Sequence, residues 1–519
     1  MSRLSPSIRR SLAALGSILI VLVYFQAGAQ LDPRPHLPDE AALAVADDTP
    51  LDRATAAVEA SHPNESAFRL VVEGTEAFVV RVQTARIAKR SLDVQSYIWH
   101  ADLTGMYFAN ELLLAADRGV KVRVLLDDVD ARRNNDSIAA LSAHPNIDIR
   151  TFNPFASRRG TLGLIAEGLH SFSRVNRRMH NKSWIADNRI AIVGGRNIGD
   201  EYFSASEAVN FLDLDFAMVG PVVRDASQSF DDYWNSAAAY PMETLDPDKV
   251  SMEALNRLRP RLAERAKQAE YSAYVQALRS NDSIKRMLEG DWPMQWSPNY
   301  RFVADDPNKV RERQSKRSQV SAALVPMAEA AQSRLSIISP YFVPGEQGTV
   351  VLTSAARNQR MVRVLTNSLV ANDVAAVHGG YSRYREPLLK AGVQIWELKP
   401  LTAGRADSSF FGSSGASLHT KALAVDGRSL FVGSYNLDPR SAWLNCEQGV
   451  LVENDALALQ LEQLFQKQTD GEHAWQVTLA NGKLSWSDGQ EHLAKEPEAS
   501  VGRRFQAWFA RTFRLDAQL

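Results

Sequence analysis

The sequence predicts an α/β protein made of two similar domains, each with a mixed β-sheet flanked by helices. The chain has 519 residues, which is enough for two or three domains. A pattern of histidine, lysine, aspartate and asparagine occurs twice, and each position of the second copy lies 239 residues after its counterpart (His180 and His419, Lys182 and Lys421, Asp187 and Asp426, Asn197 and Asn436). Residues 122–127 and 362–367 also match, so the duplication covers a whole domain.

The first domain is expected at residues 61–240 and contains a strand–helix–strand unit. Residues 91–98 have the composition of a strand, and residues 104–118 have helical periodicity. Gly119 suits the end of that helix, and a second strand is expected at residues 120–126. A unit of this kind is typical of a sheet covered by helices.

The second domain is expected at residues 321–480 and repeats this order. Strands are predicted at residues 335–341 and 362–367, with a helix at residues 349–357 between them. Residues 241–320, which separate the two domains, are rich in charge and are expected to form a helical linker.

The two ends of the chain carry different signals. Residues 1–30 begin with arginines followed by an apolar stretch, and are expected to be a signal peptide or a retained N-terminal membrane anchor; both alternatives stay open. In either case the rest of the chain is exported. Residues 31–60 are expected to be a tether, with prolines at its start.

A C-terminal tail is expected at residues 481–519. It holds a basic, aromatic amphipathic helix at residues 501–515, where four aromatic residues stand among four arginines (Phe505, Trp508, Phe509 and Phe513; Arg503, Arg504, Arg511 and Arg514). The aromatic side chains could pack on the second domain or contact a membrane.

The overall composition excludes some classes of protein. Hydrophobic residues make up 45% of the chain and charged residues 23%, as in ordinary globular proteins. The net charge of −1 speaks against a nucleic-acid-binding role, because such modules usually carry an excess of lysine and arginine. Cys446 is the single cysteine, which excludes an intramolecular disulfide and a cysteine-based zinc site.

Each histidine–lysine pair stands at the start of a predicted strand. Two residues apart, histidine and lysine share one face of the strand and lie at one end of the sheet. Asp187-Asn188 and Asp426-Gly427 suit tight turns into return strands. The two aspartates are therefore assigned to the catalytic pattern, with a turn-stabilising role as the preferred interpretation.

Two histidines, two lysines and two asparagines are suited to phosphate chemistry. One imidazole can attack phosphorus and form a covalent intermediate, while the other protonates the leaving alcohol. The lysines and amides can hold the phosphate oxygens as charge develops. This chemistry needs no metal, and no histidine spacing in the chain matches a metal motif such as HExxH.

Other residues are assigned to support this chemistry. Phosphate-binding or supporting roles are predicted for Asn197, Asn436, Ser434 and Gly195. A catalytic histidine usually needs a partner on its second ring nitrogen. Glu447 follows His419 closely in the second half, and Asp213 has a comparable place in the first half, so both are predicted to orient the histidines.

The doubled pattern His-x-Lys-x4-Asp-x6-Gly-(Gly/Ser)-x-Asn resembles the phospholipase D superfamily over about residues 65–455. More narrowly, the chain is similar to bacterial cardiolipin synthases of the C type, with supporting segments at residues 98–105, 115–120, 367–378 and 412–419. Gly195 is a departure, because the family usually has serine there. The loss of one hydroxyl donor is expected to tune the site without abolishing it.

The resemblance implies two phospholipase D-like domains with the active site at their interface. It implies phosphatidyl transfer through a phosphohistidine without a cofactor, with His180 as nucleophile and His419 as general acid and base. Cardiolipin would form from phosphatidylglycerol and either a second phosphatidylglycerol or phosphatidylethanolamine. The alternatives are a hydrolytic phospholipase D that releases phosphatidic acid, and an exported phosphodiesterase or nuclease of the same superfamily.

The resemblance also sets expectations for partners and location. The partners would be phospholipid substrates and the membrane, with a small accessory protein as a further candidate and no nucleic acid. The catalytic domains would lie on the periplasmic side of a bacterial inner membrane.

Overall fold

The structure is a computed structural model that describes residues 31, 33–156, 167, 172–206, 209–269, 286, 289, 291–312, 316–372, 374–400 and 418–513. The predicted signal peptide or anchor at residues 1–30 lies outside the described residues, as do residues 412–417 of one supporting segment. Within the described part of the chain, no helix is both long and apolar enough to cross a membrane.

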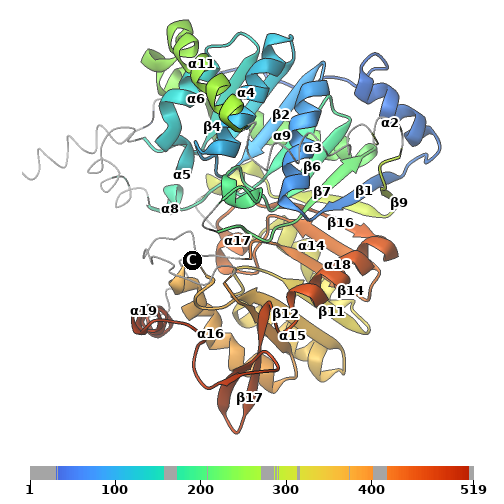
Figure 1. Cartoon of the computed structure of the whole chain (residues 1–519), viewed down its shortest axis with the longest axis vertical. Coiled ribbons are helices and arrows are strands. Elements are labelled where there is room, and N and C mark those ends of the chain that lie inside the picture. The colour runs from blue at the N-terminus through green and yellow to red at the C-terminus, as the bar shows by residue number, and fades with distance from the viewer. Residues whose placement is uncertain are drawn as a thin grey trace, which may run out of the picture.

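Two mixed β-sheets, one in each half of the chain, form the centre of the fold (Figure 1). The nine strands of the first sheet run in the order β8-β4-β3-β2-β5-β6-β7-β1-β9. They are β1 (Ser66–Val71), β2 (Ser91–Ser96), β3 (Lys121–Asp127), β4 (Ile147–Phe152), β5 (Ser183–Ala186), β6 (Ile190–Gly194), β7 (Asp215–Val219), β8 (Ala239–Pro241) and β9 (Gln295–Ser297).

The second sheet has ten strands in the order β10-β16-β15-β14-β11-β12-β13-β17-β18-β19. They are β10 (Tyr300–Ala304), β11 (Arg334–Ile338), β12 (Met361–Asn367), β13 (Gln394–Leu398), β14 (Ala422–Val425), β15 (Ser429–Gly433), β16 (Gln448–Glu453), β17 (Ala474–Ala480), β18 (Lys483–Ser487) and β19 (His492–Leu493). In both sheets three parallel strands are followed by an antiparallel hairpin, so the predicted duplication and the mixed α/β class are confirmed.

Helices cover both sheets. In the first half they are α2 (Pro50–Ala60), α3 (Gly74–Ile87), α4 (Leu103–Asp117), α5 (Asp128–Ala131), α6 (Asn135–Ser142), α8 (Phe172–Val175), α9 (Pro221–Asn235), α10 (Met242–Leu245) and α11 (Met252–Ala269). In the second half they are α14 (Gln319–Glu329), α15 (Gly345–Arg357), α16 (Ala375–Lys390), α17 (Pro439–Trp443), α18 (Asp455–Gln468) and α19 (Val501–Thr512).

A single buried apolar cluster joins the two halves. It contains side chains of β5, β6 and β7 together with side chains of β14, β15 and β16, and the helices α9 and α18 pack into it. Separate clusters lie under α3 and α4 in the first half and under α14, α15 and α16 in the second. The shared cluster holds the hairpins of the two domains together at the interface.

The expected linker and tether are more ordered than the sequence indicates. Residues 241–320 include α11, but also β9, which joins the first sheet beside β1, and β10, which joins the second beside β16. β9 has only three residues, too few for a clear alternating pattern, and in β10 only Val303 is buried. In the tether, Glu40 forms ion pairs with Lys121 and Arg150, so this segment packs against the first domain.

Candidate active site

Two β-hairpins, β5–β6 and β14–β15, carry the duplicated motif. At their turns, Asp187 and Asn188 have φ of 50° and 55°, and Asp426 and Gly427 have φ of 55° and 67°. Two successive residues with positive φ are typical of the type I′ turn, whose twist matches the strands it joins. The histidine and lysine precede the first strand of each hairpin, so they lie at the opposite end from the aspartate.

The motif aspartates bind backbone amides away from the histidines. Each carboxylate accepts hydrogen bonds from three consecutive N–H groups at 2.7–3.2 Å: those of Lys89, Arg90 and Ser91 for Asp187, and those of Gln332, Ser333 and Arg334 for Asp426. These bonds fasten the beginnings of β2 and β11 to the hairpins. The structure thus places Asp187 and Asp426 in the turn-stabilising position and not beside the histidines.

The backbone around each histidine is hydrogen-bonded to the other domain. The N–H of His180 donates to the carbonyl of Cys446 at 2.8 Å, and the N–H of His419 donates to the carbonyl of Leu212 at 2.8 Å. These carbonyls lie one residue before the predicted orienting acids, Glu447 and Asp213. Each histidine is therefore positioned by the opposite half of the chain.

The histidine–carboxylate pairs are crossed between the domains. His180 Nδ1 lies 2.9 Å from Glu447 Oε2, and His419 Nδ1 lies 2.6 Å from Asp213 Oδ2. Both carboxylates are buried. The structure brings both predicted orienting acids to motif histidines, each to the histidine of the other half. With Nδ1–H donating to the carboxylate, Nε2 is the unprotonated nitrogen of a neutral ring.

The two lysines lie close to their own histidines. Lys182 Nζ donates to the carbonyl of His180 at 2.5 Å, and Lys421 Nζ donates to the carbonyl of His419. Both lysines are buried. Burial, together with the charge of Lys421, holds the pKa of Lys182 well below its usual range. The charges of both lysines also act on both histidines, as expected where the two copies lie close together.

Burial keeps both imidazoles neutral. It lowers the pKa of His180 to about 4, and the lysine charges add to this effect while Glu447 opposes it. Burial and the charge of Lys421 lower the pKa of His419 to about 3, against the opposing effect of Asp213. Burial alone would raise the pKa of Glu447, but His180 and Lys182 outweigh it and lower that pKa to about 2. At neutral pH the site has neutral imidazoles and an ionised Glu447.

The two copies differ around the carboxylates, and the departure at Gly195 has a steric reason. A Cβ atom at Gly195 would lie 2.1 Å from Asp213 Oδ1, so a side chain there would displace the Asp213 carboxylate. In the second copy Ser434 stands at this position, and its hydroxyl donates to Glu447 Oε2 at 2.6 Å. Ser441 donates to the other carboxylate oxygen at 2.8 Å. Each copy thus has its own combination beside the carboxylate: Gly195 with Asp213 in the first, and Ser434 with Glu447 in the second.

The motif asparagines are buried close to these groups. Asn197 Oδ1 accepts the N–H of Ile98 at 3.3 Å, and its amide donates to the hydroxyl of Tyr202 at 2.9 Å. The backbone N–H of Asn436 donates to Ser441 Oγ at 3.3 Å. Asn197 connects two segments of the first domain, and phosphate binding by either amide stays a prediction.

Three aromatic side chains that the sequence did not single out also line the site. The ring of Tyr97 meets His180 edge-on at 5.0 Å between centroids. Phe211 stacks on His419 at 5.6 Å, and Tyr202 meets the same ring edge-on at 5.1 Å. Of these three residues, only Tyr97 could have been assigned to the site from the sequence, because it lies at the end of a predicted strand. These rings fix the imidazole planes and contribute to their burial.

Comparisons with known proteins identify the family of this chain. The family model described as "Cardiolipin synthase, PLD-like domain" matches residues 82–234 and 324–469, which is more than half of the chain. Cardiolipin synthase C of Escherichia coli (strain K12) is 39% identical over 454 residues, covering 85% of this chain and 94% of that protein. Cardiolipin synthase A of Pseudomonas entomophila (strain L48) is 26% identical over 416 residues, covering 80% and 70%.

A solved structure has the same fold. Phosphatidylserine synthase of Haemophilus influenzae Rd KW20 superposes with a TM-score of 0.55 at 15% identity, covering 90% of this chain and 100% of that chain. At this identity the likeness concerns the fold alone. The family match in both halves, the 39% identity over most of the chain and the doubled histidine–lysine site agree. This chain therefore belongs to the cardiolipin synthase family with phospholipase D-like domains.

Proposed function

We propose that this protein is a phosphatidyltransferase that makes cardiolipin from phosphatidylglycerol and either a second phosphatidylglycerol or phosphatidylethanolamine. The observation that carries the proposal is the crossed pairing: each neutral motif histidine is held through Nδ1 by a buried carboxylate of the other domain. Two buried lysines stand beside these rings. Family membership supplies the class of substrate.

In the first step, His180 acts as the nucleophile. Its Nε2 lone pair forms a bond to the phosphorus of the donor lipid, and the bond from phosphorus to the leaving headgroup oxygen breaks. The proton on that oxygen comes from His419. The bound phosphodiester anion offsets the lysine charge that lowers the pKa of His419, so His419 can carry a proton in the complex.

In the second step, the phosphatidyl group passes to the acceptor. A glycerol hydroxyl of phosphatidylglycerol attacks phosphorus and gives its proton to His419, while the bond between phosphorus and His180 breaks. Glu447 stabilises the positive charge that His180 carries in the intermediate, because its carboxylate accepts from Nδ1 at 2.9 Å. Lys182 and Lys421 stabilise the phosphate oxygens in both steps.

The test is mass spectrometry of lipids after the purified chain is added to phosphatidylglycerol vesicles, with and without phosphatidylethanolamine. Cardiolipin is expected with the wild type, and its yield should fall by about 10³-fold or more in His180→Ala and His419→Ala. His492→Ala, at an exposed position, is the control. Phosphatidic acid as the only product would indicate a hydrolase. Activity that requires an added small protein would indicate an accessory partner.

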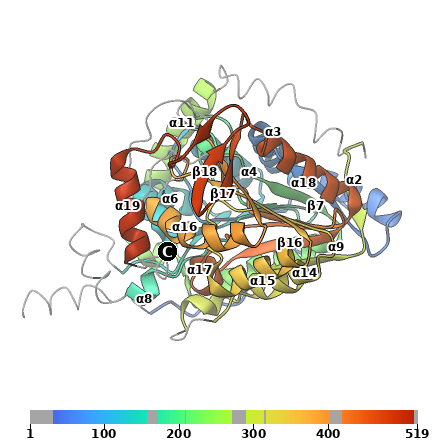
Figure 2. The ribbon, with the colours of Figure 1, turned by 90° about the horizontal axis from the view of Figure 1, so that it is seen from below.

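We further propose that α19 rests on a membrane surface. The helix turns its small residues Ala507 and Ala510 toward α16, where a Cβ at Gly379 would meet the Ala507 carbonyl at 2.5 Å. Its large apolar side chains face outward: Val501, Phe505, Trp508 and Phe513 are 56–81% exposed. A helix that packs only against protein normally turns its large apolar side chains inward and its polar side chains to solvent. Figure 2 shows α19 at the side of the molecule beside α16.

Hydrogen bonds also connect α19 to the segment that carries His419. Arg503, buried on its inner face, donates through Nε to the carbonyl of Leu369 at 3.2 Å, in the loop after β12. Asn367, at the end of β12, bonds both backbone groups of Leu418, the neighbour of His419. Flotation with phosphatidylglycerol vesicles tests the proposal. Phe505→Ser with Trp508→Ser should weaken binding about tenfold, whereas Leu459→Ser, at an exposed position of α18, should not.

We propose that the catalytic domains lie on the periplasmic side of a bacterial inner membrane. The support for this proposal is the sequence of residues 1–30, in which arginines precede the apolar stretch. Protease digestion of spheroplasts tests it: a chain that survives digestion in intact spheroplasts would place the domains on the cytoplasmic side.

A further inference from the structure

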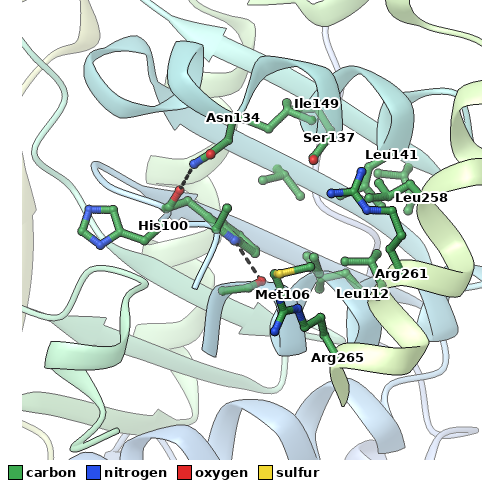
Figure 3. A pocket seen from close by; sticks show the side chains of 18 of the residues that line it. His100, Met106, Leu112, Asn134, Ser137, Leu141, Ile149, Leu258, Arg261 and Arg265 are labelled. Atoms are coloured by element: carbon green, nitrogen blue, oxygen red, sulfur yellow. Dashed lines mark hydrogen bonds between the residues drawn. The ribbon is translucent and has the colours of Figure 1, made fainter. Parts of the chain in front are cut away.

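A large cleft lies in the first domain, apart from the histidine site. It has a volume of about 650 Å³ and is bounded by β3, β4, α4, α6 and α11 (Figure 3). Its walls are apolar and consist largely of buried side chains, among them Ala109, Leu112, Val124, Ile149, Leu258 and Leu262. The volume falls in the range of ligand pockets.

Two arginines of α11 line the cleft. Arg261 and Arg265 are four residues apart, so they lie on the same side of the helix. In the view of Figure 3, Arg261 lies beside Leu141 and Leu258, and Arg265 lies beside Met106. Other arginines of this helix have acidic partners: Arg257 pairs with Glu253, and Arg259 pairs with Asp117. Within the described part of the chain, neither Arg261 nor Arg265 has an ion-pair partner. Arg265 also donates through Nη1 to Gln268 Oε1 at 3.3 Å, and Glu264, which accepts from Gln268 at 3.1 Å, lines the same cleft. Because no carboxylate is ion-paired with either guanidinium group among the described residues, both are available to an anionic ligand.

We propose that this cleft binds the acyl chain of an anionic amphiphile, with its charged headgroup on Arg261 and Arg265. The apolar walls suit a hydrocarbon chain, because each buried methylene group contributes to binding. The two guanidinium groups suit a phosphate or carboxylate. A phospholipid and a free fatty acid share this chemistry. The inference rests on the proposed function in one respect: a phosphatidyltransferase acts where lipids are present.

The cleft also has a short structural connection to the histidine site. Trp99 is one of the lining residues; its ring N–H donates to the carbonyl of Gly105 at 3.1 Å, and its carbonyl accepts from Asn134 at 3.0 Å. The neighbouring N–H of Ile98 is bound by Asn197 of the motif at 3.3 Å. A lipid in the cleft thus contacts a wall that continues into the motif.

Native mass spectrometry of the full chain tests the proposal, with palmitate and palmitoyl-lysophosphatidylglycerol as probes in separate arms. The wild type is expected to form a one-to-one adduct with at least one of them, and the stronger adduct identifies the source of the ligand. Ala109→Phe, which fills the cleft, and Arg261→Ala with Arg265→Ala should each weaken binding at least tenfold. Arg257→Ala, on the same helix but paired with Glu253, is the matched control.

The double variant His180→Ala with His419→Ala should bind the probes like the wild type, because neither His180 nor His419 lines the cleft. The absence of any adduct, or adducts that survive both the filling and the arginine substitutions, would overturn the inference. Cardiolipin formation by a chain that binds neither probe would refute this site and leave the proposed function standing. If the chain forms an adduct that depends on the cleft but makes no cardiolipin, the lipid site stands and the proposed function is refuted.

Discussion

Acidification is expected to destabilise this protein through its two motif histidines. The folded state holds the pKa of His180 at about 4 and that of His419 at about 3, mainly through burial. In the unfolded chain an imidazole titrates near about 6.5. Between these values the unfolded state binds more protons than the folded state, so the free energy of unfolding falls as the pH drops below 6.5.

The expected loss follows from these pKa values. One pKa unit corresponds to about 1.4 kcal/mol. At a pH of about 4.5, roughly two units below the unfolded pKa, each histidine costs about 2.5 kcal/mol, and the pair costs about 5 kcal/mol. That is comparable to the whole stability of many domains, about 5–15 kcal/mol. Glu447, whose lowered pKa is about 2, adds a loss only at lower pH, because its stabilisation is present above its ordinary pKa.

Urea unfolding at pH 7 and pH 4.5 measures this effect. The variants are His180→Gln, His419→Gln and their combination, with the exposed His492→Gln as control. We expect the drop in unfolding free energy between the two pH values to be about 2–3 kcal/mol smaller in each single variant, and about 5 kcal/mol smaller in the double variant. The control should match the wild type.

One result would refute the reasoning. If the double variant loses as much stability on acidification as the wild type does, the histidines are not held neutral by burial. Coincident fluorescence and circular dichroism transitions are required, because a two-domain chain can unfold in steps.

Three further predictions concern the rest of the site. Asp213→Asn should lower kcat by about 10²–10⁴-fold and change the imidazole NMR signal of His419 in the other domain, and an unchanged signal would contradict the crossed pairing. Gly195→Ser alone should destabilise the fold because its Cβ meets Asp213, while the added change Asp213→Glu should restore stability by copying the second half; equal melting temperatures of the single and double variants would argue against the clash. Asp187→Asn and Asp426→Asn should each cost about 1–3 kcal/mol of stability in urea unfolding with kcat unchanged, so a loss of kcat at full stability would restore these residues to a chemical role.

Much of the local structure could be predicted from the sequence. The helix expected at residues 104–118 is α4 at Leu103–Asp117, and the strand expected at residues 362–367 is β12 at Met361–Asn367. The hydrophobic pattern within each of these segments is enough to predict its type. The edge strands β9 and β10 could not be predicted, because β9 has only three residues and β10 buries only Val303, so neither shows a clear hydrophobic pattern.

The sequence by itself determined which residues make up the candidate site. The constant spacing of the two copies identified the histidines and lysines, and the comparable places of Asp213 and Glu447 indicated acidic partners for them. The turn chemistry at Asp187 and Asp426 was equally local, since it depends on two adjacent residues with positive φ.

Only the tertiary structure decided how these residues combine. His180 meets Glu447 across 267 positions of sequence, and His419 meets Asp213 across 206. Sequence order would pair each histidine with the acid of its own half. The domain interface crosses the pairs because each histidine's N–H bonds a carbonyl beside the opposite acid. Burial, which lowers both histidine pKa values, likewise exists only once the two halves close on each other.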